Sequence, residues 1–484
     1  MASGNVLLKN MSWKFAERIT AQVVTFLVTI VLSRILDPSD YGVVAIVMVY
    51  IAIANVFVSH GLGSALVQKQ SVDALDFSSA LYFNVAFSCV IYGVLFMIAP
   101  LVARFFGEGY EVLTPILRVL GLRIIVAAVN SVQHAYVSRH MIFEKFFWAT
   151  LFGTVASAFV GIWMAHHGFG AWAIVGQYLT NTTVDTLVLA LVLRKRPILA
   201  FSFARVRGLF SFGIKILGSG LLVAVYTELR SFIIGKVYTS SDLAFYDKAR
   251  NFPNLLVNNF VSTVSAVLFP YMSNEQDNLA RLKATTKRSI RFTSFLMCPL
   301  LFGLAAVAET LIRVLLTDKW LPCVPLLRIL CINSLWRPIH EANIQAIKAT
   351  GRSDVILILE VIKKSIELAV LLLVMRISVD AIVVSMAVNS TLFVFLNAFP
   401  NKKLLNYPLR EQLLDMLPPM LMASVMLLCV LAVQLLGLSP LVTLALQLAV
   451  GAGVFISLAV LTGNKEYRYL LNLVKKKVCR HGTT

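Results

Sequence analysis

The sequence has few charged side chains and no cysteine pattern of a metal or disulfide site. Only 14% of its 484 residues are charged and 58% are hydrophobic, whereas a typical soluble domain is about 25% charged. The six cysteines form no CxxC pair and no Cys/His ligand spacing, so neither a metal centre nor a disulfide framework is expected. No long polar stretch could form a catalytic domain outside a membrane. We therefore expect a polytopic membrane protein that is not an enzyme.

Acidic residues are scarce beside basic ones. The chain has 24 Asp and Glu against 43 Lys and Arg, which gives a net charge of +19. The cations border apolar runs instead of forming one stripe, so a nucleic-acid partner is not expected. With the N-terminus placed inside, the inside loops carry several times more basic residues than the outside loops. The positive-inside rule then predicts a multi-pass membrane protein with both termini in the cytoplasm.

Apolar runs dominate the rest of the chain, and each is long enough to cross a bilayer as a helix of about 20 residues. The fold class predicted is all-α, with about 14 transmembrane helices. The predicted segments are 16–36, 41–63, 78–103, 112–137, 146–165, 170–193, 209–236, 241–270, 289–316, 323–348, 354–376, 379–400, 413–437 and 440–462.

Two pairs of short motifs indicate an internal duplication. SRILDPSD at 33–40 matches GKVYTSSD at 235–242, and PILRVL at 115–120 matches PLLRIL at 325–330. The offsets, 202 and 210 residues, are nearly equal, as expected of a repeat. An even number of helices in each repeat predicts parallel halves, an arrangement that transporters use for alternating access. The predicted domains are a six-helix bundle at 1–198, a second at 199–405, and two extra helices with a basic tail at 406–484.

Five motifs, in one order along the first half, carry a family resemblance. They are SRILDPSDYGVVAI (33–46), GLGSALVQ (61–68), APLVARFFGE (99–108), PILRVLGL (115–122) and GFGAWAIVGQ (168–177). Together they resemble the polysaccharide exporters, lipid-linked oligosaccharide flippases of the multidrug/oligosaccharidyl-lipid/polysaccharide superfamily, and the colanic-acid and succinoglycan branch above all.

The resemblance implies a fold and a function. The fold is two six-helix bundles around a central cavity, with the last two helices helping to form a groove for a lipid tail. The function is the translocation of undecaprenyl-diphosphate-linked oligosaccharide units to the periplasmic leaflet, for exopolysaccharide, colanic-acid-like or O-antigen assembly. Membrane lipid is then a partner, and a polysaccharide polymerase and the chain-length machinery are candidate partners.

Basic residues inside apolar segments are the candidate binding residues for an anionic lipid diphosphate. An Arg or Lys at mid-bilayer costs about 2.5–3.5 kcal/mol, so it normally faces a wet interior or a partner. Arg123, Arg230 and Lys248 have no acidic residue three or four positions away. A side chain without such a neighbour cannot be neutralised along its own helix. These three are the first candidates for a cationic cavity.

Other intramembrane charges leave two interpretations open. Arg250 has Asp247 three residues before it, and Arg337 has Glu341 four residues after it. Each of these cations either forms a local ion pair or joins the cavity. Arg18 lies at the inner mouth, where it either binds substrate or acts as a positive-inside residue.

Acidic residues inside the segments are candidates for coupling transport to H⁺ or Na⁺. They are Asp185, Glu228, Asp247 and Glu341. No cofactor is expected. The alternative function is a drug or cation antiporter of the same fold, which a predominantly cationic cavity disfavours because it would repel an organic cation. A membrane glycosyltransferase acting on the same lipid would need an extramembrane region or an acidic metal cluster, and the sequence has neither.

Overall fold

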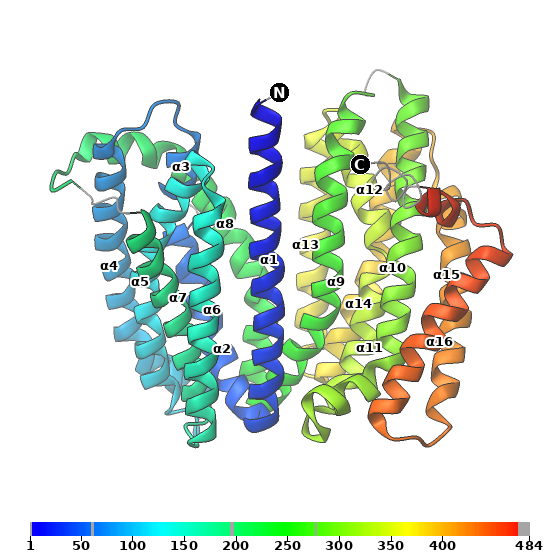
Figure 1. The fold of residues 1–484 in the computed structure, drawn as a ribbon, viewed down its shortest axis with the longest axis horizontal. Helices are drawn as coiled ribbons and strands as arrows, with labels where there is room; N and C mark the ends of the chain where they lie inside the picture. Colours follow the sequence, from blue (N-terminus) through cyan, green and yellow to red (C-terminus); the bar gives the residue numbers. More distant parts are fainter. Residues whose placement is uncertain (1, 60–61, 194–197, 276–277, 473–484) are drawn as a thin grey trace. The chain divides into compact units, whose positions relative to one another are not determined.

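The computed structural model describes residues 2–59, 62–193, 198–275 and 278–472, and all regular structure in these ranges is helical (Figure 1). The α-helices are α1 Ala2–Ile35, α2 Pro38–Ser59, α3 Leu62–Gln68, α4 Ala74–Phe106, α5 Leu113–His140, α6 Phe143–His166, α7 Ala171–Leu193, α8 Phe203–Val237, α9 Ser240–Ser273, α10 Leu279–Leu316, α11 Cys323–Ser334, α12 Arg337–Ala349, α13 Ser353–Val374, α14 Val379–Leu404, α15 Leu409–Gln434 and α16 Pro440–Leu461.

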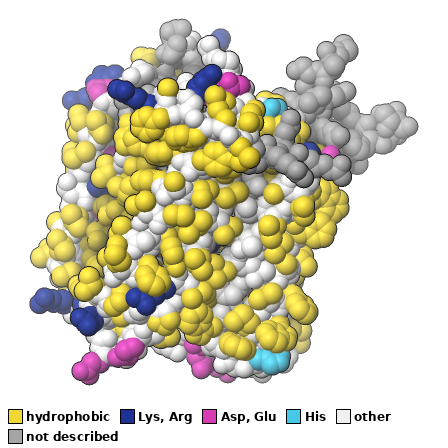
Figure 2. Space-filling view, turned by 90° about the vertical axis from the view of Figure 1, so that its left-hand side faces the viewer, with side chains coloured by type: hydrophobic (Ala, Val, Ile, Leu, Met, Phe, Trp, Pro, Cys, Tyr) yellow, Lys and Arg dark blue, Asp and Glu magenta, His cyan; other side chains and the backbone are white. Residues whose placement is uncertain are grey.

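The helices agree with the predicted spanning segments. Most segments fall on one long helix each. Segment 41–63 covers α2 and reaches the start of α3, with residues 60 and 61 outside the described ranges. Segment 323–348 is divided between α11 and α12, where Pro338 at the start of α12 cannot donate a hydrogen bond to the preceding turn. Ten helical stretches in the described ranges are long and apolar enough to cross a membrane. Figure 2 shows a broad hydrophobic band with charged side chains gathered toward its two ends. The predicted fold class, an all-α polytopic membrane protein, is confirmed.

The chain divides into two compact units, Met1–Ala244 (unit 1) and Phe245–Thr484 (unit 2). In unit 1, α5 packs against α2, α3, α4 and α7, while α6 packs against α1 and α7. The first helix after the predicted boundary at 198, α8, packs against α2, α3 and α4. The predicted domains 1–198, 199–405 and 406–484 rest on sequence duplication and stay a prediction.

One end of unit 1 brings together motifs that are far apart in the sequence. The backbone of Ser240 lies so close to α2 that a Cβ on Gly42 would be 1.7 Å from the Ser240 carbonyl oxygen. At Gly170, where φ is +53°, a Cβ would be 3.0 Å from Asp40 Oδ1. The loops before α2, α7 and α9 therefore meet at this end, and two motif glycines make room for them.

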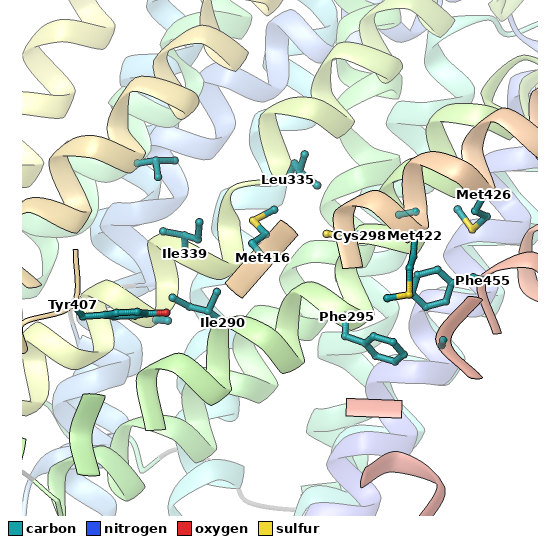
Figure 3. Packing of buried hydrophobic residues seen from close by; sticks show 14 of the residues in the cluster. Ile290, Phe295, Cys298, Leu335, Ile339, Tyr407, Met416, Met422, Met426 and Phe455 are labelled. Atoms are coloured by element: carbon teal, nitrogen blue, oxygen red, sulfur yellow. The ribbon is translucent and has the colours of Figure 1, made fainter. Parts of the chain in front are cut away.

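Unit 2 has a methionine-rich core between α10, α12, α15 and α16 (Figure 3). Met416, Met422 and Met426 of α15 belong to this core, and the rings of Phe295 and Phe455 are 5.2 Å apart. The core attaches α15 and α16, which follow the predicted duplication, to α10.

Two local geometries recur at the predicted offsets. The Asp37 amide donates to Asp40 Oδ2 at 3.2 Å, and the Thr239 amide donates to Asp242 Oδ2 at 3.1 Å. These bonds satisfy the first N–H groups at two helix starts, as a capping box does. Similarly, Arg118 Nε donates to the carbonyl of residue 96 and Arg328 Nε to that of residue 305, both at 3.3 Å. The local contacts of the paired motifs are thus alike in the two predicted repeats.

Candidate functional site

Unit 1 contains a polar cavity of about 460 Å³ bounded by α2, α3, α5 and α7. We call it the unit-1 cavity. Its lining is mostly hydroxyl, amide and charged side chains: Asn55, Ser59, Gly63, Ser64, Val67, Arg123, Ala127, Asn130, Ser131, His134, Ala135, Ser138, Asn181, Thr182 and Asp185. Each of these helices also has buried apolar residues that lie outside the cavity.

Helix α5 supplies the cavity with polar residues on one face. Arg123, Asn130 and His134 are separated by seven and four residues, which places them on one side of an α-helix. Asn181, Thr182 and Asp185 do the same on α7. The two polar faces meet where Asn130 contacts Asp185, and Gly153 of α6 lets α7 approach α6 closely.

Gly153 sets the separation between α6 and α7. A Cβ at this position would be 3.0 Å from the carbonyl oxygen of Asn181 and 3.1 Å from Asp185 Cβ. Such distances are tighter than ordinary van der Waals contact, so a larger residue would displace α7. The position of Asp185 in the cavity thus depends on a glycine in a third helix.

Arg123 is held by two contacts with α7. Its Nε donates to Thr182 Oγ1 at 2.8 Å, and its guanidinium lies 5.3 Å from the centre of the Tyr178 ring. The Thr182 contact uses one of the five N–H donors of a guanidinium. The fixed fork can therefore present further donors to an anion in the cavity, and bidentate contact with phosphate or carboxylate is the geometry it favours.

Asp185 is the acidic group of the cavity. Asn130 Nδ2 donates to its Oδ2 at 2.7 Å, and His134 Nε2 lies 3.6 Å from the same oxygen. Among the described residues, nothing forms a hydrogen bond with Asp185 Oδ1 or with His134 Nε2. A buried carboxylate oxygen without a partner is costly. A proton or a small cation at this position would reduce that cost.

Unit 2 has a different pocket, apolar and about 320 Å³, between α10, α11 and α15. We call it the unit-2 groove. Its lining is Leu301, Phe302, Ala305, Arg328, Cys331, Ile332, Leu335, Leu427 and Leu431. Arg328 is its charged residue, and its Nη2 lies 3.9 Å from Glu309 Oε2. The groove therefore suits a hydrocarbon chain better than a polar ligand.

The helices of unit 2 that correspond to α5 and α7 also carry polar side chains. They are α11 with α12, and α14. Asn333 and His340 lie five and twelve residues after Arg328, as Arg123 and Asn130 do after Arg118. The His340 ring is 2.8 Å from Asn397 Nδ2 and 3.1 Å from the Ser390 carbonyl oxygen. Both ring nitrogens are thus engaged, whereas the corresponding face of unit 1 lines a cavity.

The other predicted binding residues have their own local surroundings. Lys248 is buried, only 6% exposed, and its Nζ is 5.0 Å from the centre of the Trp320 ring. Arg250 pairs with Asp247 at 3.4 Å, the local ion pair that the sequence suggested. The Arg230 guanidinium lies 5.9 Å from the Tyr226 ring centre. Arg18 is exposed on α1.

Two more predicted residues occupy helix α12. Arg337 is its first residue, and Glu341 accepts a hydrogen bond from Gln345 Nε2 at 2.6 Å. Glu228 is half-buried on α8. Of the ten predicted residues, Arg123 and Asp185 line the unit-1 cavity, and the assembly of the remainder into one cationic cavity stays a prediction. In the described ranges no group of three or more His, Cys, Asp or Glu side chains could hold a metal ion.

The family described as "Polysaccharide biosynthesis protein" matches residues 31–325, which is more than half of the chain. The chain belongs to this family. The matched range contains every residue that lines the unit-1 cavity. The polysaccharide exporter family predicted from the five motifs is thereby confirmed.

Curated relatives of this polysaccharide biosynthesis protein match about two thirds of its length. It is 25% identical to the succinoglycan biosynthesis transport protein ExoT of Rhizobium meliloti, over 68% of this chain and 67% of that protein. It is 24% identical to the lipopolysaccharide biosynthesis protein WzxC of Escherichia coli, over 67% and 66%, and 22% identical to the teichuronic acid biosynthesis protein TuaB of Bacillus subtilis, over 62% of each.

Solved structures share the fold at low sequence identity. The lipid II flippase MurJ in an inward closed conformation superposes with a TM-score of 0.73 at 15% identity, covering 95% of this chain and 100% of that one. An inward-facing multidrug resistance MATE transporter superposes with a TM-score of 0.60 at 13% identity, covering 79% and 95%. The predicted membrane-transporter fold is confirmed by these similarities.

The sequence alone identified only part of the cavity in this family member. Asn130 and His134 were not among the predicted site residues. They lie seven and eleven residues after Arg123, respectively, and therefore on the same face of the helix. A search of that face for polar residues would have found both. No signal in the sequence pairs them with Asp185, which is more than 50 residues away and on another helix.

Proposed function

We propose that this polysaccharide biosynthesis protein is a flippase that moves undecaprenyl-diphosphate-linked oligosaccharide units across the cytoplasmic membrane by alternating access. The observation that carries the proposal is the unit-1 cavity, a polar space of about 460 Å³ within helices long enough to cross a membrane. A polar cavity at membrane depth is expensive unless it accommodates water or a polar ligand.

The chemistry of the cavity suits an anionic glycan. Amide and hydroxyl side chains such as Asn55, Asn181 and Ser131 can donate to and accept from sugar hydroxyls. Arg123 can grip a phosphate or an acidic sugar with two parallel hydrogen bonds. A volume of 460 Å³ is within the range of ligand pockets, about 300–1,000 Å³, and suits part of a repeat unit.

The unit-2 groove supports a lipid-linked substrate. Its leucine and phenylalanine lining, including Leu301, Phe302 and Leu431, suits an isoprenoid chain. Burial of such a chain is favourable in proportion to the apolar area removed from water. We therefore propose this groove as a binding surface for an isoprenoid chain.

We further propose that Asp185 couples transport to H⁺ or Na⁺. Its Oδ1 atom has no hydrogen-bond partner among the described residues, and His134 lies beside its other oxygen. Exchange of a cation at this carboxylate would change the net charge of the cavity by one unit. Such a change alters the attraction between Arg123 and an anionic ligand, which makes it a suitable coupling step.

The names of the relatives support the same class of activity, because ExoT is a transport protein of succinoglycan biosynthesis and WzxC serves lipopolysaccharide biosynthesis. MurJ, which shares the fold, is a lipid II flippase. A polysaccharide polymerase and its chain-length machinery would consume the translocated lipid, so we propose them as partners.

Reconstitution of the full chain in proteoliposomes tests the proposal. The vesicles would contain undecaprenyl-diphosphate-linked oligosaccharide with a labelled sugar, and a membrane-impermeant glycosidase would report the leaflet in which it lies. We expect the accessible fraction to rise with time in protein-containing vesicles and not in empty ones. If no glycolipid moved while a fluorescent organic cation was exchanged for protons, the antiporter would be the correct function instead.

A further inference from the structure

The segment that precedes α8 is fixed against the beginning of α4. The Ile198 amide donates to Ser78 Oγ at 2.8 Å, and the Ser202 amide donates to Ser79 Oγ at 3.0 Å. Tyr82 Oη donates to the Ile198 carbonyl oxygen at 3.1 Å. Three hydrogen bonds to one helix give residues 198–202 a defined path although they are not helical.

This path leaves large apolar side chains facing outward. Leu199 is 97% exposed, Phe203 is 64% exposed and Phe201 is 52% exposed. Contiguous apolar groups of this size are unfavourable in water and mark a surface for a partner or a membrane. They lie beside the first residues of α4, a helix long enough to span the bilayer. At that depth an apolar side chain reaches the boundary between lipid head groups and acyl chains.

A cluster of ionic side chains lies directly beside the apolar ones. Lys69 Nζ contacts both carboxylate oxygens of the fully buried Asp76, at 2.7 and 2.8 Å. Arg205 of α8 lies 3.2 Å from Asp73 and 3.5 Å from Asp76. The hydrogen bond from the Asp76 amide, followed by the charge of Arg205, lowers the pKa of the Asp73 carboxyl. Both acids are therefore already engaged within the protein.

Cations outnumber acids at this place. Arg139 of α5 donates to carbonyl oxygens of residues 66, 67, 69 and 70, and Arg207 is exposed on the first turns of α8. Together with Lys69 and Arg205 they give four positive charges, against the two negative charges of Asp73 and Asp76. Figure 2 displays the left-hand side of the view in Figure 1, and Lys and Arg side chains gather there along the upper end, above the hydrophobic band.

A pocket of about 220 Å³ opens between α3 and the start of α8. It is lined by Ala65, Gln68, Lys69, Ala204, Arg205, Gly208 and Leu209. The side chains of Lys69 and Arg205 are 31% and 43% exposed. A guanidinium has five donors and an ammonium three, so both can bind an anion while they keep their carboxylate partners.

We propose that this pocket binds the head group of an anionic phospholipid, with its phosphate on Lys69 and Arg205 and its acyl chains against Leu199 and Phe203. A cation cluster next to exposed apolar side chains at the end of a spanning helix is the chemistry that an anionic lipid surface satisfies on both sides. The site is separate from the unit-1 cavity and does not depend on the transported substrate.

Native mass spectrometry of the purified full chain tests this site. The protein is incubated with equimolar phosphatidylglycerol and phosphatidylethanolamine, and the bound lipid is counted. We expect phosphatidylglycerol to be retained preferentially. A basic residue near an anionic lipid surface contributes roughly fivefold in affinity, so R205Q should lower phosphatidylglycerol binding about fivefold. Lys69 is left unchanged because its loss would leave the buried Asp76 with a weaker partner.

Matched variants separate the site from general surface charge. R410Q removes an exposed cation at the second residue of α15 and should leave lipid binding unchanged. L199S/F203S should weaken the binding of both lipids, because it removes apolar contacts and no charge. Equal retention of the two lipids by the wild type, or R205Q behaving like R410Q, would overturn the proposal. Displacement of the bound lipid by millimolar inorganic phosphate would also overturn it, since it would identify a site for the free anion.

Discussion

Asn130 Nδ2 donates to Asp185 Oδ2 at 2.7 Å and so joins the polar faces of α5 and α7 in unit 1. The corresponding position of unit 2 is His340, which contacts Asn397 of α14. Both residues lie twelve positions after an arginine whose Nε donates to a carbonyl of the preceding helix. The two units thus have polar contacts at corresponding helix pairs. In unit 1 these contacts are combined with a cavity and an acidic residue.

Replacement of Asp185 tests its proposed coupling role. D185N keeps the size of the side chain but removes its charge and its exchangeable proton. We expect glycolipid transport in proteoliposomes to lose its dependence on a pH or Na⁺ gradient and its gradient-driven rate to fall at least tenfold. Binding of the glycolipid without a gradient should persist, because Arg123 is retained.

The matched control is D380N, in the first turn of α14, where the carboxylate is exposed. It should leave both the rate and the gradient dependence unchanged. Normal gradient dependence in D185N would show that the coupling group lies elsewhere.

A larger residue at position 153 should disturb the cavity from outside it. G153V places atoms where the Asn181 carbonyl and the Asp185 side chain lie, so α7 must shift. Overpacking of this kind costs about 1–3 kcal/mol, and we expect a lower melting temperature together with reduced transport. The control is G93A on α4, where a Cβ would meet no atom within 4 Å. Alanine there should stabilise the helix by up to about 1 kcal/mol. Equal melting temperatures for G153V and G93A would contradict the account.

Gly42 should be the more sensitive glycine. G42A would place Cβ 1.7 Å from the Ser240 carbonyl oxygen, a distance that backbone atoms cannot accept without moving the loop before α9. We expect little folded protein, measured as the monodisperse fraction after detergent extraction. G453A on α16 meets no atom within 4 Å and serves as the control. Wild-type yield of G42A would mean that this loop is free to move away from α2.

The helices could be predicted from the sequence because their cause is local. A run of about 20 apolar residues crosses a bilayer whatever surrounds it, and the Asp37–Asp40 helix start depends on residues three apart. Pairs within a turn could be predicted in part. Arg250 pairs with Asp247 as expected, whereas Lys363 pairs with Glu360, three residues before it.

The site could not be predicted to the same extent because its contacts are long-range. Nothing within one turn of Arg123 reveals Thr182 as its partner, and the proximity of His134 to Asp185 depends on how α5 and α7 pack. That packing depends in turn on Gly153, whose role is visible only when α7 lies against it. The predicted residues Arg230 and Lys248 share with Arg123 the absence of a helical acid, and the cavity predicted to join the three stays a prediction.

Labelling of single cysteines tests the predicted orientation. The Asp40, Gly170 and Ser240 regions share one end of unit 1. Because basic residues are in excess in the loops of the opposite side, the positive-inside rule predicts that these regions lie outside. In a cysteine-free background, a cysteine at position 239 should react with a membrane-impermeant maleimide from the periplasmic side. A cysteine at position 70, at the other end of the unit, should react only after the membrane is permeabilised. The reverse pattern would contradict the orientation.

The central claim is that the unit-1 cavity holds the anionic part of the glycolipid through Arg123. Equilibrium binding of undecaprenyl-diphosphate-linked oligosaccharide to the purified chain tests it most directly. A hydrogen bond to a charged group contributes about 1.5–3 kcal/mol, so R123A should raise Kd roughly 10- to 150-fold. The Kd of R123K should lie between those of the wild type and R123A, because lysine keeps the positive charge but lacks the guanidinium fork. R118A is the control, since Arg118 contacts Phe96 and does not line the cavity. A wild-type Kd for R123A at wild-type melting temperature would contradict the account.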